Sequence, residues 1–130
     1  MIKIKIITPI GLYLSEEVEA IHLKTVEGER TILPNHMPIV AMLATSKLSL
    51  KKNGNYEDYA ISSGMLQFMD NEARILTDTI EGKAEIDLAR ALEARKRAEQ
   101  RLAKIDSKTN IRRAEIALDK AINRIRVSNH

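Results

Sequence analysis

The sequence predicts an α+β protein, with an antiparallel β-sandwich or barrel over residues 1–82 and a two-helix hairpin over residues 83–130. Three observations support this prediction. Apolar residues recur with a period of two up to about residue 80, which is typical of strands with one buried face. Gly, Asn and Asp punctuate these segments and favour hairpin turns. At Gly82 the period changes to about 3.6 residues, which is typical of amphipathic helices.

The N-terminal part contains several short segments that alternate apolar and polar side chains. Residues 2–6 alternate isoleucine with lysine. Asn53-Gly54, a strong signal for a two-residue hairpin turn, stands between two such segments. Residues 27–29 and 69–72 are further predicted turns. Many short strands with regular turns favour a compact antiparallel sandwich or barrel.

After Gly82 the pattern predicts two amphipathic helices joined by a polar break at residues 106–110, with Asn110 as the cap of the second helix. Both apolar faces are rich in alanine, which buries little area. We therefore expect a weakly stable hairpin that can open or leave the sandwich. The predicted apolar positions are Leu88, Ala91, Leu92, Ala98, Leu102 and Ile105 on the first helix, and Ile111, Ala114, Leu118, Ala121, Ile122 and Ile125 on the second.

The composition bounds the kinds of site that the chain can contain. Hydrophobic residues make up 44% of the 130 residues and aromatic ones only 3%, so we expect a core of Ile, Leu, Val, Ala and Met. Cysteine is absent, which excludes disulfides, cysteine-rich zinc sites and thiol nucleophiles. We expect no signal peptide, and no apolar run approaches the roughly 20 residues of a membrane-spanning helix.

The net charge of +3 is unevenly divided between the two parts of the chain. Residues 1–82 carry 8 Lys/Arg and 11 Asp/Glu, whereas residues 83–130 carry 13 and 7. A basic hairpin attached to a mildly acidic body favours an anionic partner for the hairpin. A solvated helical face with interspersed acids explains the same counts, so both interpretations stay open.

The start of the first predicted helix carries an unexpected arginine. Asp87 is a favourable N-cap, but Arg90 stands three residues later, where a capping box has Glu or Gln. A cation at this position opposes the helix dipole. Its presence therefore calls for a partner, either within the chain or in a bound ligand.

Arg90 belongs to one of two basic stripes with the same spacing. If the helices pair, both stripes border one groove, which suits a polyphosphate or a carboxylate because arginine offers bidentate contacts. Alternatively, these cations form ordinary ion pairs with Glu93, Glu99 and Glu115. The stripes consist of Arg90, Arg97 and Arg101 on the first helix and Arg113, Lys120 and Arg124 on the second.

Three segments resemble the epsilon subunit of F-type ATP synthases. They are EGERTILPNHMPIVAML (27–43), AISSGMLQFMDNEARILTD (60–78) and IDLARA (86–91), and their order and spacing also match. The resemblance covers essentially the whole chain. It implies an N-terminal antiparallel β-sandwich of about ten strands followed by a C-terminal two-helix antiparallel hairpin, in agreement with the periodicity.

The resemblance also implies a function. Epsilon is a non-catalytic subunit of the central rotor, and its sandwich docks on the gamma subunit and the c-subunit ring. It couples proton flow to ATP synthesis and is peripheral on the cytoplasmic side of the cell membrane, without inserting into it. Its hairpin either folds on the sandwich or extends toward the alpha and beta catalytic subunits, where it restrains ATP hydrolysis. In several bacterial members the folded hairpin binds ATP as a regulatory ligand, and no covalent cofactor is implied.

The resemblance can be carried over residue by residue. Lys120 stands where nucleotide-binding relatives often have arginine, and lysine loses the bidentate fork. A hairpin that binds ATP weakly, or that does not inhibit, therefore stays an alternative. Glu29 and His36 match positions near the c ring; otherwise His36 is only a solvated turn residue. The positions that match the ATP site are Glu81, Ile86, Asp87, Arg90, Ala91, Arg97, Lys120 and Arg124.

The remaining patterns indicate no separate catalytic or metal site. The three histidines lack metal-ligand spacing, and residues 62–64 indicate a turn rather than a nucleophile elbow. Met65, Leu66, Phe68 and Met69 form either a patch for gamma or part of the core. A free-standing ATP sensor and, more remotely, a basic nucleic-acid-binding module are alternatives, although the few aromatic residues lack the spacing of a stacking platform.

Overall fold

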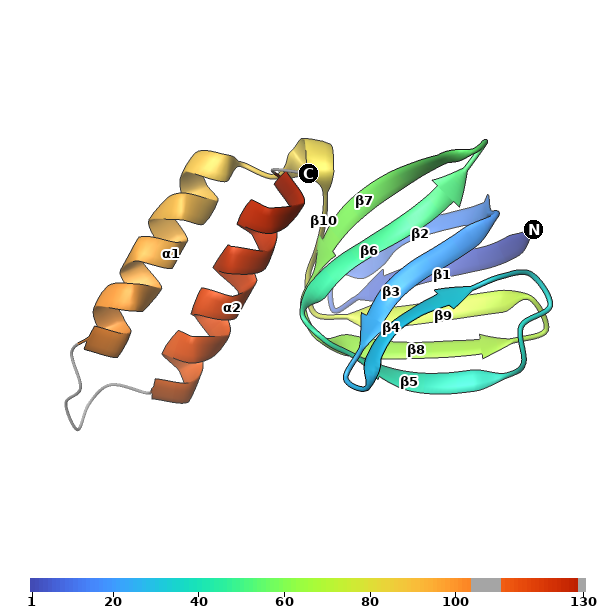
Figure 1. Cartoon of the computed structure of the whole chain (residues 1–130), viewed down its shortest axis with the longest axis horizontal. Coiled ribbons are helices and arrows are strands. Elements are labelled where there is room, and N and C mark those ends of the chain that lie inside the picture. Colours follow the sequence, from blue (N-terminus) through green and yellow to red (C-terminus); the bar gives the residue numbers. More distant parts are fainter. Residues whose placement is uncertain (104–110, 129–130) are drawn as a thin grey trace. The chain divides into compact units, whose positions relative to one another are not determined.

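The computed structural model describes residues 1–103 and 111–128. It divides into two compact units, Met1–Lys83 and Ala84–His130. The first is a β-sandwich and the second contains two helices, which confirms the predicted α+β class (Figure 1). The elements are β1 (Ile2–Thr8), β2 (Gly11–Val18), β3 (Ala20–Thr25), β4 (Gly28–Ile32), β5 (Ile39–Leu43), β6 (Ser46–Lys52), β7 (Asn55–Ile61), β8 (Gly64–Met69), β9 (Glu72–Thr77), β10 (Ile80–Gly82), the 3₁₀ turn η1 (Lys83–Glu85), α1 (Leu88–Ala103) and α2 (Ile111–Ser128).

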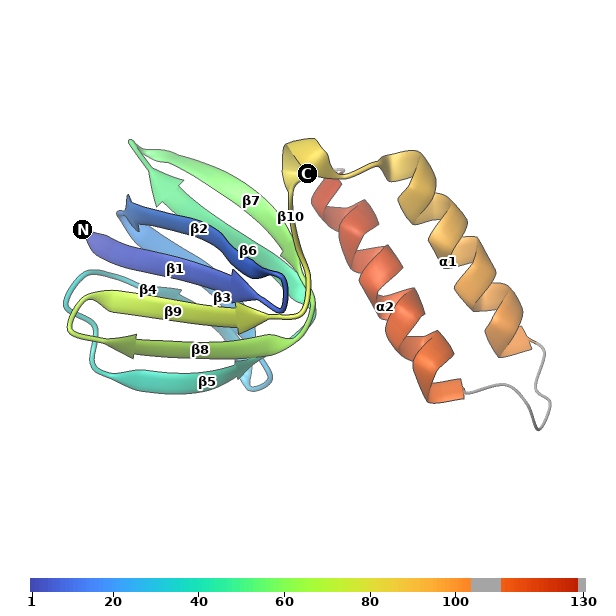
Figure 2. The same cartoon turned by 180° about the vertical axis from the view of Figure 1, so that it is seen from behind.

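The ten strands form one sheet that folds over on itself (Figures 1 and 2). The strand order is β10-β7-β6-β3-β5-β8-β9-β1-β2, and β4 pairs with β3 outside this path. The pairs are antiparallel, as predicted, except that β1 and β9 run parallel. This parallel pair joins segments about seventy residues apart and places the first strand between β9 and β2.

The core of the sandwich consists of the alternating inward residues of the strands. Isoleucine and leucine dominate it, and Phe68 is its largest fully buried side chain. The expectation that methionine contributes to the core is wrong, because all five methionines lie in the described residues and none of them is buried. Branched aliphatic side chains fill the space between the strands and leave the flexible thioethers to the surface.

Two of the three predicted turns are confirmed with both central residues at positive φ. Asn53 and Gly54 have φ angles of 51° and 80° and connect β6 to β7. Asp70 and Asn71 have φ angles of 52° and 58° and connect β8 to β9. Positive φ at both central residues is the signature of a type I′ turn, whose twist matches that of the flanking strands.

A polar cluster around Lys52 links β2, at one end of the strand order, to β6 and β7, near the other end. Lys52 on β6 forms ion pairs with Glu16 on β2 and with Glu57 on β7, the latter with 2.9 Å between Nζ and Oε2. Tyr59 donates a hydrogen bond to the same Glu57 oxygen at 3.0 Å. Burial alone would lower the pKa of Lys52, but the hydrogen bonds to Glu16 and Glu57 outweigh this effect and raise it.

The helices of the second unit pack along each other with alanines at the buried positions. Ala91 and Ala98 on α1, and Ala114 and Ala121 on α2, are buried. Each pair is spaced by seven residues, which keeps the small side chains on one seam. Fewer of the predicted apolar positions are buried than expected on α1, because Leu92 is 46% exposed and Leu88 is also exposed.

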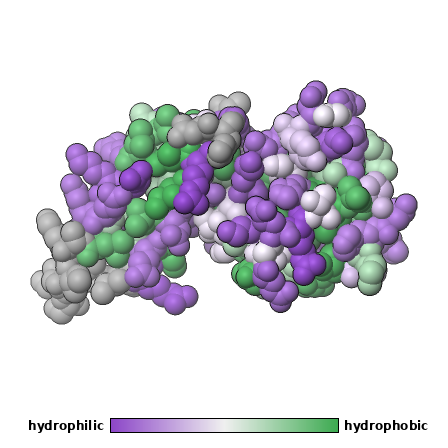
Figure 3. Space-filling view, in the orientation of Figure 1, coloured by the Kyte–Doolittle hydropathy of each residue, from purple (hydrophilic) through white to green (hydrophobic). Residues whose placement is uncertain are grey.

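Other parts of the hairpin prediction stay untested by the structure. The predicted break at residues 106–110, the cap Asn110 and the stripe residue Ile105 lie outside the described residues. Figure 3 shows hydrophobic side chains exposed between hydrophilic ones on the face of the hairpin seen there. None of the described helices combines the length and the apolar character needed to cross a bilayer.

Candidate functional site

The start of α1 is built around Asp87. Its backbone carbonyl accepts the first helical hydrogen bond from the Ala91 N–H at 3.0 Å, and its Oδ1 accepts one from the Arg90 N–H at 3.1 Å. The predicted N-cap is therefore confirmed. The Arg90 Nε lies 3.7 Å from Asp87 Oδ2, so the arginine pairs with the capping carboxylate. This contact offsets the unfavourable position of the cation in the first turn.

The Asp87–Arg90 pair is open to solvent. The Arg90 side chain is 82% exposed, so the attraction within the pair is weak and either group can exchange its partner for a ligand. Arg97, further along α1, is also exposed. These side chains are accessible cations on one helix, as an anion site requires.

The cations on α2 are less exposed. Lys120 and Arg124 are half-buried, and the Nε atom of Arg124 is shielded from solvent. The two helices are antiparallel, so the first turn of α1 lies at the same end of the hairpin as the last turns of α2 (Figures 1 and 2). The hairpin therefore gathers Asp87 and Arg90 at the end where α2 carries Arg124.

The other predicted nucleotide residues differ in position and exposure. Glu81 lies on β10 opposite Ala60, in the sandwich unit. Ile86 is half-buried before α1, and Ala91 is fully buried in the alanine seam. Ala91 therefore acts by letting the helices approach closely rather than through polar contacts.

The acids that the alternative ion-pair interpretation assigns to the stripe cations have one printed ion pair on the first helix, and its cation is not a stripe residue. Glu99 pairs with Arg95, with 2.9 Å between Oε1 and Nε. Arg95 does not belong to the basic stripes, and it lies one turn away on the helix surface. The stripe member Arg90 pairs with Asp87 instead, so its ion pair is not one of those predicted with Glu93, Glu99 or Glu115.

The loop that contains His36 is held in one conformation. Asn35 has a φ of 66°, and its backbone N–H donates to Oδ1 of Asn71 in the β8–β9 turn. Asn71 Nδ2 donates in return to Asn35 Oδ1 at 2.8 Å. These reciprocal hydrogen bonds tie the loop to a neighbouring turn, which adds to the stiffness that its two prolines provide.

His36 is packed rather than merely solvated. Its ring lies edge-to-face against Phe68, with centroids 5.9 Å apart, and its Nδ1 is 2.7 Å from the Met37 carbonyl oxygen. Because a carbonyl only accepts, Nδ1 carries the proton and Nε2 is left as the second polar atom of the ring. Glu29 is exposed on β4, opposite Lys24. Both residues are thus held on ordered elements of the sandwich.

The outer face of the sheet carries a row of apolar side chains across five strands. Strand register pairs Met42 with Met65, Met65 with Leu76, Leu76 with Ile7, and Ile7 with Leu12. We call these five residues the apolar row. Met42 is 55% and Leu12 61% exposed. A continuous exposed apolar surface of this kind is typical of an interaction site.

The register also separates the four residues whose role the sequence left open. Leu66 and Phe68 point into the core, where both are buried. Met65 belongs to the apolar row, and Met69 is 62% exposed near the His36 loop. The core interpretation is therefore confirmed for Leu66 and Phe68 and wrong for Met65 and Met69, because alternate residues of one strand face opposite sides of a sheet. A patch for gamma at Met65 and Met69 stays a prediction.

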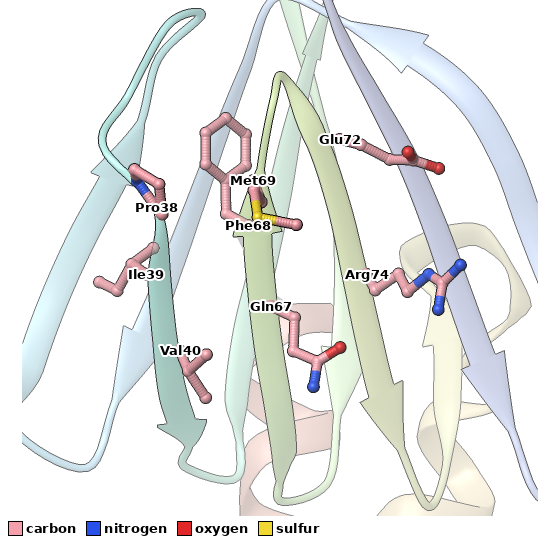
Figure 4. Close-up of a pocket in the computed structure, with 8 residues that line it drawn as sticks. All are labelled: Pro38, Ile39, Val40, Gln67, Phe68, Met69, Glu72 and Arg74. Carbon is pink, nitrogen blue, oxygen red and sulfur yellow. The ribbon is translucent and has the colours of Figure 1, made fainter.

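A shallow hollow lies between the His36 loop and the apolar row. Figure 4 shows its lining side chains on the neighbouring strands β5, β8 and β9. Val40, Gln67 and Arg74 form a mixed row across these strands by register. Glu72, another lining residue, pairs with Lys5 at 3.9 Å. The face thus changes from apolar at one end to mixed polar toward the loop.

Sequence reasoning missed most of the apolar row. Ile7, Leu12, Met42 and Leu76 occupy positions that an amphipathic strand normally gives to polar residues. The row could have been suspected from the sequence, because several predicted strands carry an apolar residue on their outward side. The strand order that places these residues in one row was not available from the sequence.

The comparisons with known proteins account for both units. The beta-sandwich domain of the ATP synthase delta/epsilon chain matches residues 1–83, and its long alpha-helix domain matches residues 84–129. The chain belongs to the ATP synthase delta/epsilon family. The predicted resemblance is thereby confirmed, and family membership makes the chain a non-catalytic subunit of ATP synthase.

Individual members of the family match over nearly their full length. The ATP synthase epsilon chain of Pediococcus pentosaceus is 40% identical, with 100% of this chain and 96% of the relative covered. That of Bacillus velezensis is also 40% identical, with 99% and 98% covered. A chain in the OSCP/F1/c-ring structure of the Euglena gracilis mitochondrial ATP synthase has 27% identity and a TM-score of 0.84, with 99% of this chain and 81% of that chain covered.

Proposed function

We propose that this family member is a central-stalk rotor subunit that couples proton flow to ATP synthesis. This proposal rests on one observation: the sandwich presents both the ordered His36 loop and the exposed apolar row. The Euglena neighbour, solved in an assembly of F1 and the c ring, supports such a setting. The subunit is then peripheral on the cytoplasmic side of the cell membrane and is held there by its partners.

The His36 loop contacts the c-subunit ring in this proposal. Glu29 and His36 are the predicted contact residues, and the Asn35–Asn71 hydrogen bonds keep the loop ordered before docking. Order in the free state lowers the entropic cost of binding. Cysteine substitutions at Glu29 and His36 should form crosslinks with c-subunit loops in the assembled complex. Absence of crosslinks at both positions would contradict the assignment.

The apolar row contacts the gamma subunit. Burying exposed apolar side chains stabilises a complex by about 25 cal/mol per Å² removed from water, so burial of the row favours this contact. Met65→Glu would place a charge in the row, between Met42 and Leu76, and should abolish co-purification with gamma. Gln67→Glu, two residues along the same face, is the matched control and should retain gamma.

The folded hairpin binds ATP through the cations of both helices. The phosphates are neutralised by four cations, Arg90, Arg97, Lys120 and Arg124. The base donates a hydrogen bond to the Asp87 carboxylate and accepts one from a backbone N–H at the start of α1. Glu81, Ile86 and Ala91 complete the proposed set. Exposed Arg90 and half-buried Arg124 support the proposal because they lie toward one end of the hairpin. Binding only to the closed form stabilises it by roughly 2.7 kcal/mol at a hundredfold excess of ATP over the dissociation constant.

Equilibrium dialysis of the full chain tests the ATP site. Arg90→Ala should lower ATP uptake, whereas Arg95→Ala, on the same helix but paired with Glu99, should leave it unchanged. Equal loss in both variants would indicate a nonspecific charge effect. Lys120→Arg should raise the affinity because arginine supplies the bidentate fork that lysine lacks.

The extended hairpin restrains ATP hydrolysis by contacting an acidic segment of the catalytic alpha and beta subunits. Opposite charge favours this encounter, and the same arginines cannot bind both partners at once. Because the chain divides after Lys83, a truncation at that residue keeps the sandwich unit whole. The truncated subunit should assemble and raise ATP hydrolysis in the complex. Unchanged hydrolysis would show that the hairpin does not inhibit here.

A further inference from the structure

The methionines of this chain are concentrated on one part of its surface. Apart from the N-terminal residue, they are Met37 in the His36 loop, Met42 on β5, and Met65 and Met69 on β8. Met37 is 76% exposed, and none of the four is buried. The core contains no methionine. The oxidisable side chains therefore lie beside the proposed docking surfaces. Thioethers on a binding surface are sensitive to oxidation, which makes them polar.

Met42 and Met65 form the part of this set with the clearest geometry. They are direct cross-strand partners on β5 and β8, so their side chains lie on the same outer face. They line one shallow hollow that leaves the sulfurs within reach of a small solute. Ile7 and Leu76 are its other large apolar residues, and Thr8, Ser63, Thr77 and Asp78 are its polar ones. The two residues make up one end of the apolar row, and Leu76 and Ile7 continue it without offering a side-chain hydrogen-bond donor.

We propose that the Met42–Met65 pair is an oxidation site that controls docking of the sandwich on gamma. This inference rests on the proposed gamma contact of the apolar row. The oxidant is a peroxide: a sulfur lone pair attacks one peroxide oxygen, the O–O bond breaks and an S–O bond forms. Sulfur is oxidised by two electrons to the sulfoxide, and hydrogen peroxide is reduced to water. Methionine sulfoxide reductases, which act on the two sulfoxide epimers, reverse the change.

The sulfoxide changes docking without changing the fold. Its oxygen is a strong acceptor, and burying it against an apolar partner leaves it without a donor. Burying one unsatisfied acceptor in an interface corresponds to about a tenfold weaker complex or more. Because both sulfurs are outside the core, the sandwich should keep its melting temperature after oxidation. Damage to the core would lower it.

The test uses the full chain and purified gamma subunit. Hydrogen peroxide is applied until peptide mass spectrometry shows complete sulfoxide at Met42 and Met65, and gamma binding is then measured. We expect at least about tenfold weaker binding, with recovery after treatment with both reductases. In Met42→Leu/Met65→Leu, gamma binding is measured before and after peroxide, and the treatment should leave it unchanged because the oxidisable sulfurs are gone. The matched control Met37→Leu/Met69→Leu should bind gamma and stay sensitive.

Each outcome separates the two proposals. Unchanged gamma binding by the oxidised wild-type chain overturns the oxidation site and leaves the gamma contact standing. Equal sensitivity of the Met42→Leu/Met65→Leu variant also overturns it, because other methionines are then responsible. Failure of the untreated chain to bind gamma overturns the docking proposal and this inference with it.

Discussion

The carboxylate of Asp87 accepts a hydrogen bond from the backbone N–H of Arg90 at 3.1 Å and lies 3.7 Å from the guanidinium Nε of the same residue. One acid therefore both caps α1 and pairs with the cation in its first turn. The pair explains how the helix tolerates Arg90 without a ligand. Because it is exposed, it also leaves Arg90 available to one.

Removing the cap should loosen the start of α1. Asp87→Ala leaves the Arg90 N–H without its acceptor and should destabilise the helix start by about 1 kcal/mol. Asp87→Asn keeps a side-chain acceptor and should cost only a few tenths of that amount. Amide exchange of residues 88–91 measures both effects. Equal protection in the wild type and Asp87→Ala would show that the cap contributes nothing.

The alanine seam should not accept a larger side chain. Ala121→Leu inserts a bulky group where the helices are closest and should destabilise the hairpin by about 1–3 kcal/mol. Ala89→Leu, an exposed position on α1, is the control and should have no such effect. Hydrogen exchange across α1 and α2 distinguishes the variants. High protection in the Ala121→Leu hairpin would mean that the seam is not tightly packed.

Lys52 should contribute to the stability of the sandwich. Lys52→Met removes the cation between Glu16 and Glu57 and leaves the two carboxylates to repel each other. We expect a loss of about 1–3 kcal/mol in the free energy of unfolding. Lys24→Met removes an exposed lysine and should be nearly neutral. Urea unfolding of the truncated sandwich and of the full chain provides the measurement, and similar values for both variants would contradict the expectation.

The same cluster predicts a pH dependence. Hydrogen bonds from Lys52 and from Tyr59 lower the pKa of Glu57 below its ordinary 4.5. The contribution of Glu57 is therefore complete above pH 4.5 and is lost as the pH falls through the lower folded-state pKa. Glu57→Gln should flatten the acid limb of the stability curve. Lys52, whose pKa is raised, loses its contribution only as the pH rises above 10.5. An unaltered acid limb in Glu57→Gln would exclude this origin.

Gly64 should not tolerate a side chain. An added Cβ would lie 2.0 Å from the backbone oxygen of Leu76, which is held in the β8–β9 ladder. Gly64→Ala must therefore move one strand, and we expect a cost of about 3 kcal/mol or more. Ser63→Ala, at the exposed neighbouring position, should be nearly neutral. A melting temperature of Gly64→Ala equal to the wild type would show that the strands separate easily.

The local features of this protein follow from its sequence alone. The positive-φ turns at Asn53-Gly54 and Asp70-Asn71, the Asp87 cap and the alanine seam depend on residues that are close in the chain. Such features follow from backbone preferences and from the helical period, so they could be predicted without a structure.

The pairing of strands that are distant in the chain follows from the complete fold. The parallel pairing of β1 with β9 puts Ile7 beside Leu76, and the register of β8 puts Leu76 beside Met65. No local signal specifies these pairs, because their free energy comes from burying the other face of every strand at once. The apolar row and its two oxidisable sulfurs are therefore consequences of the complete fold.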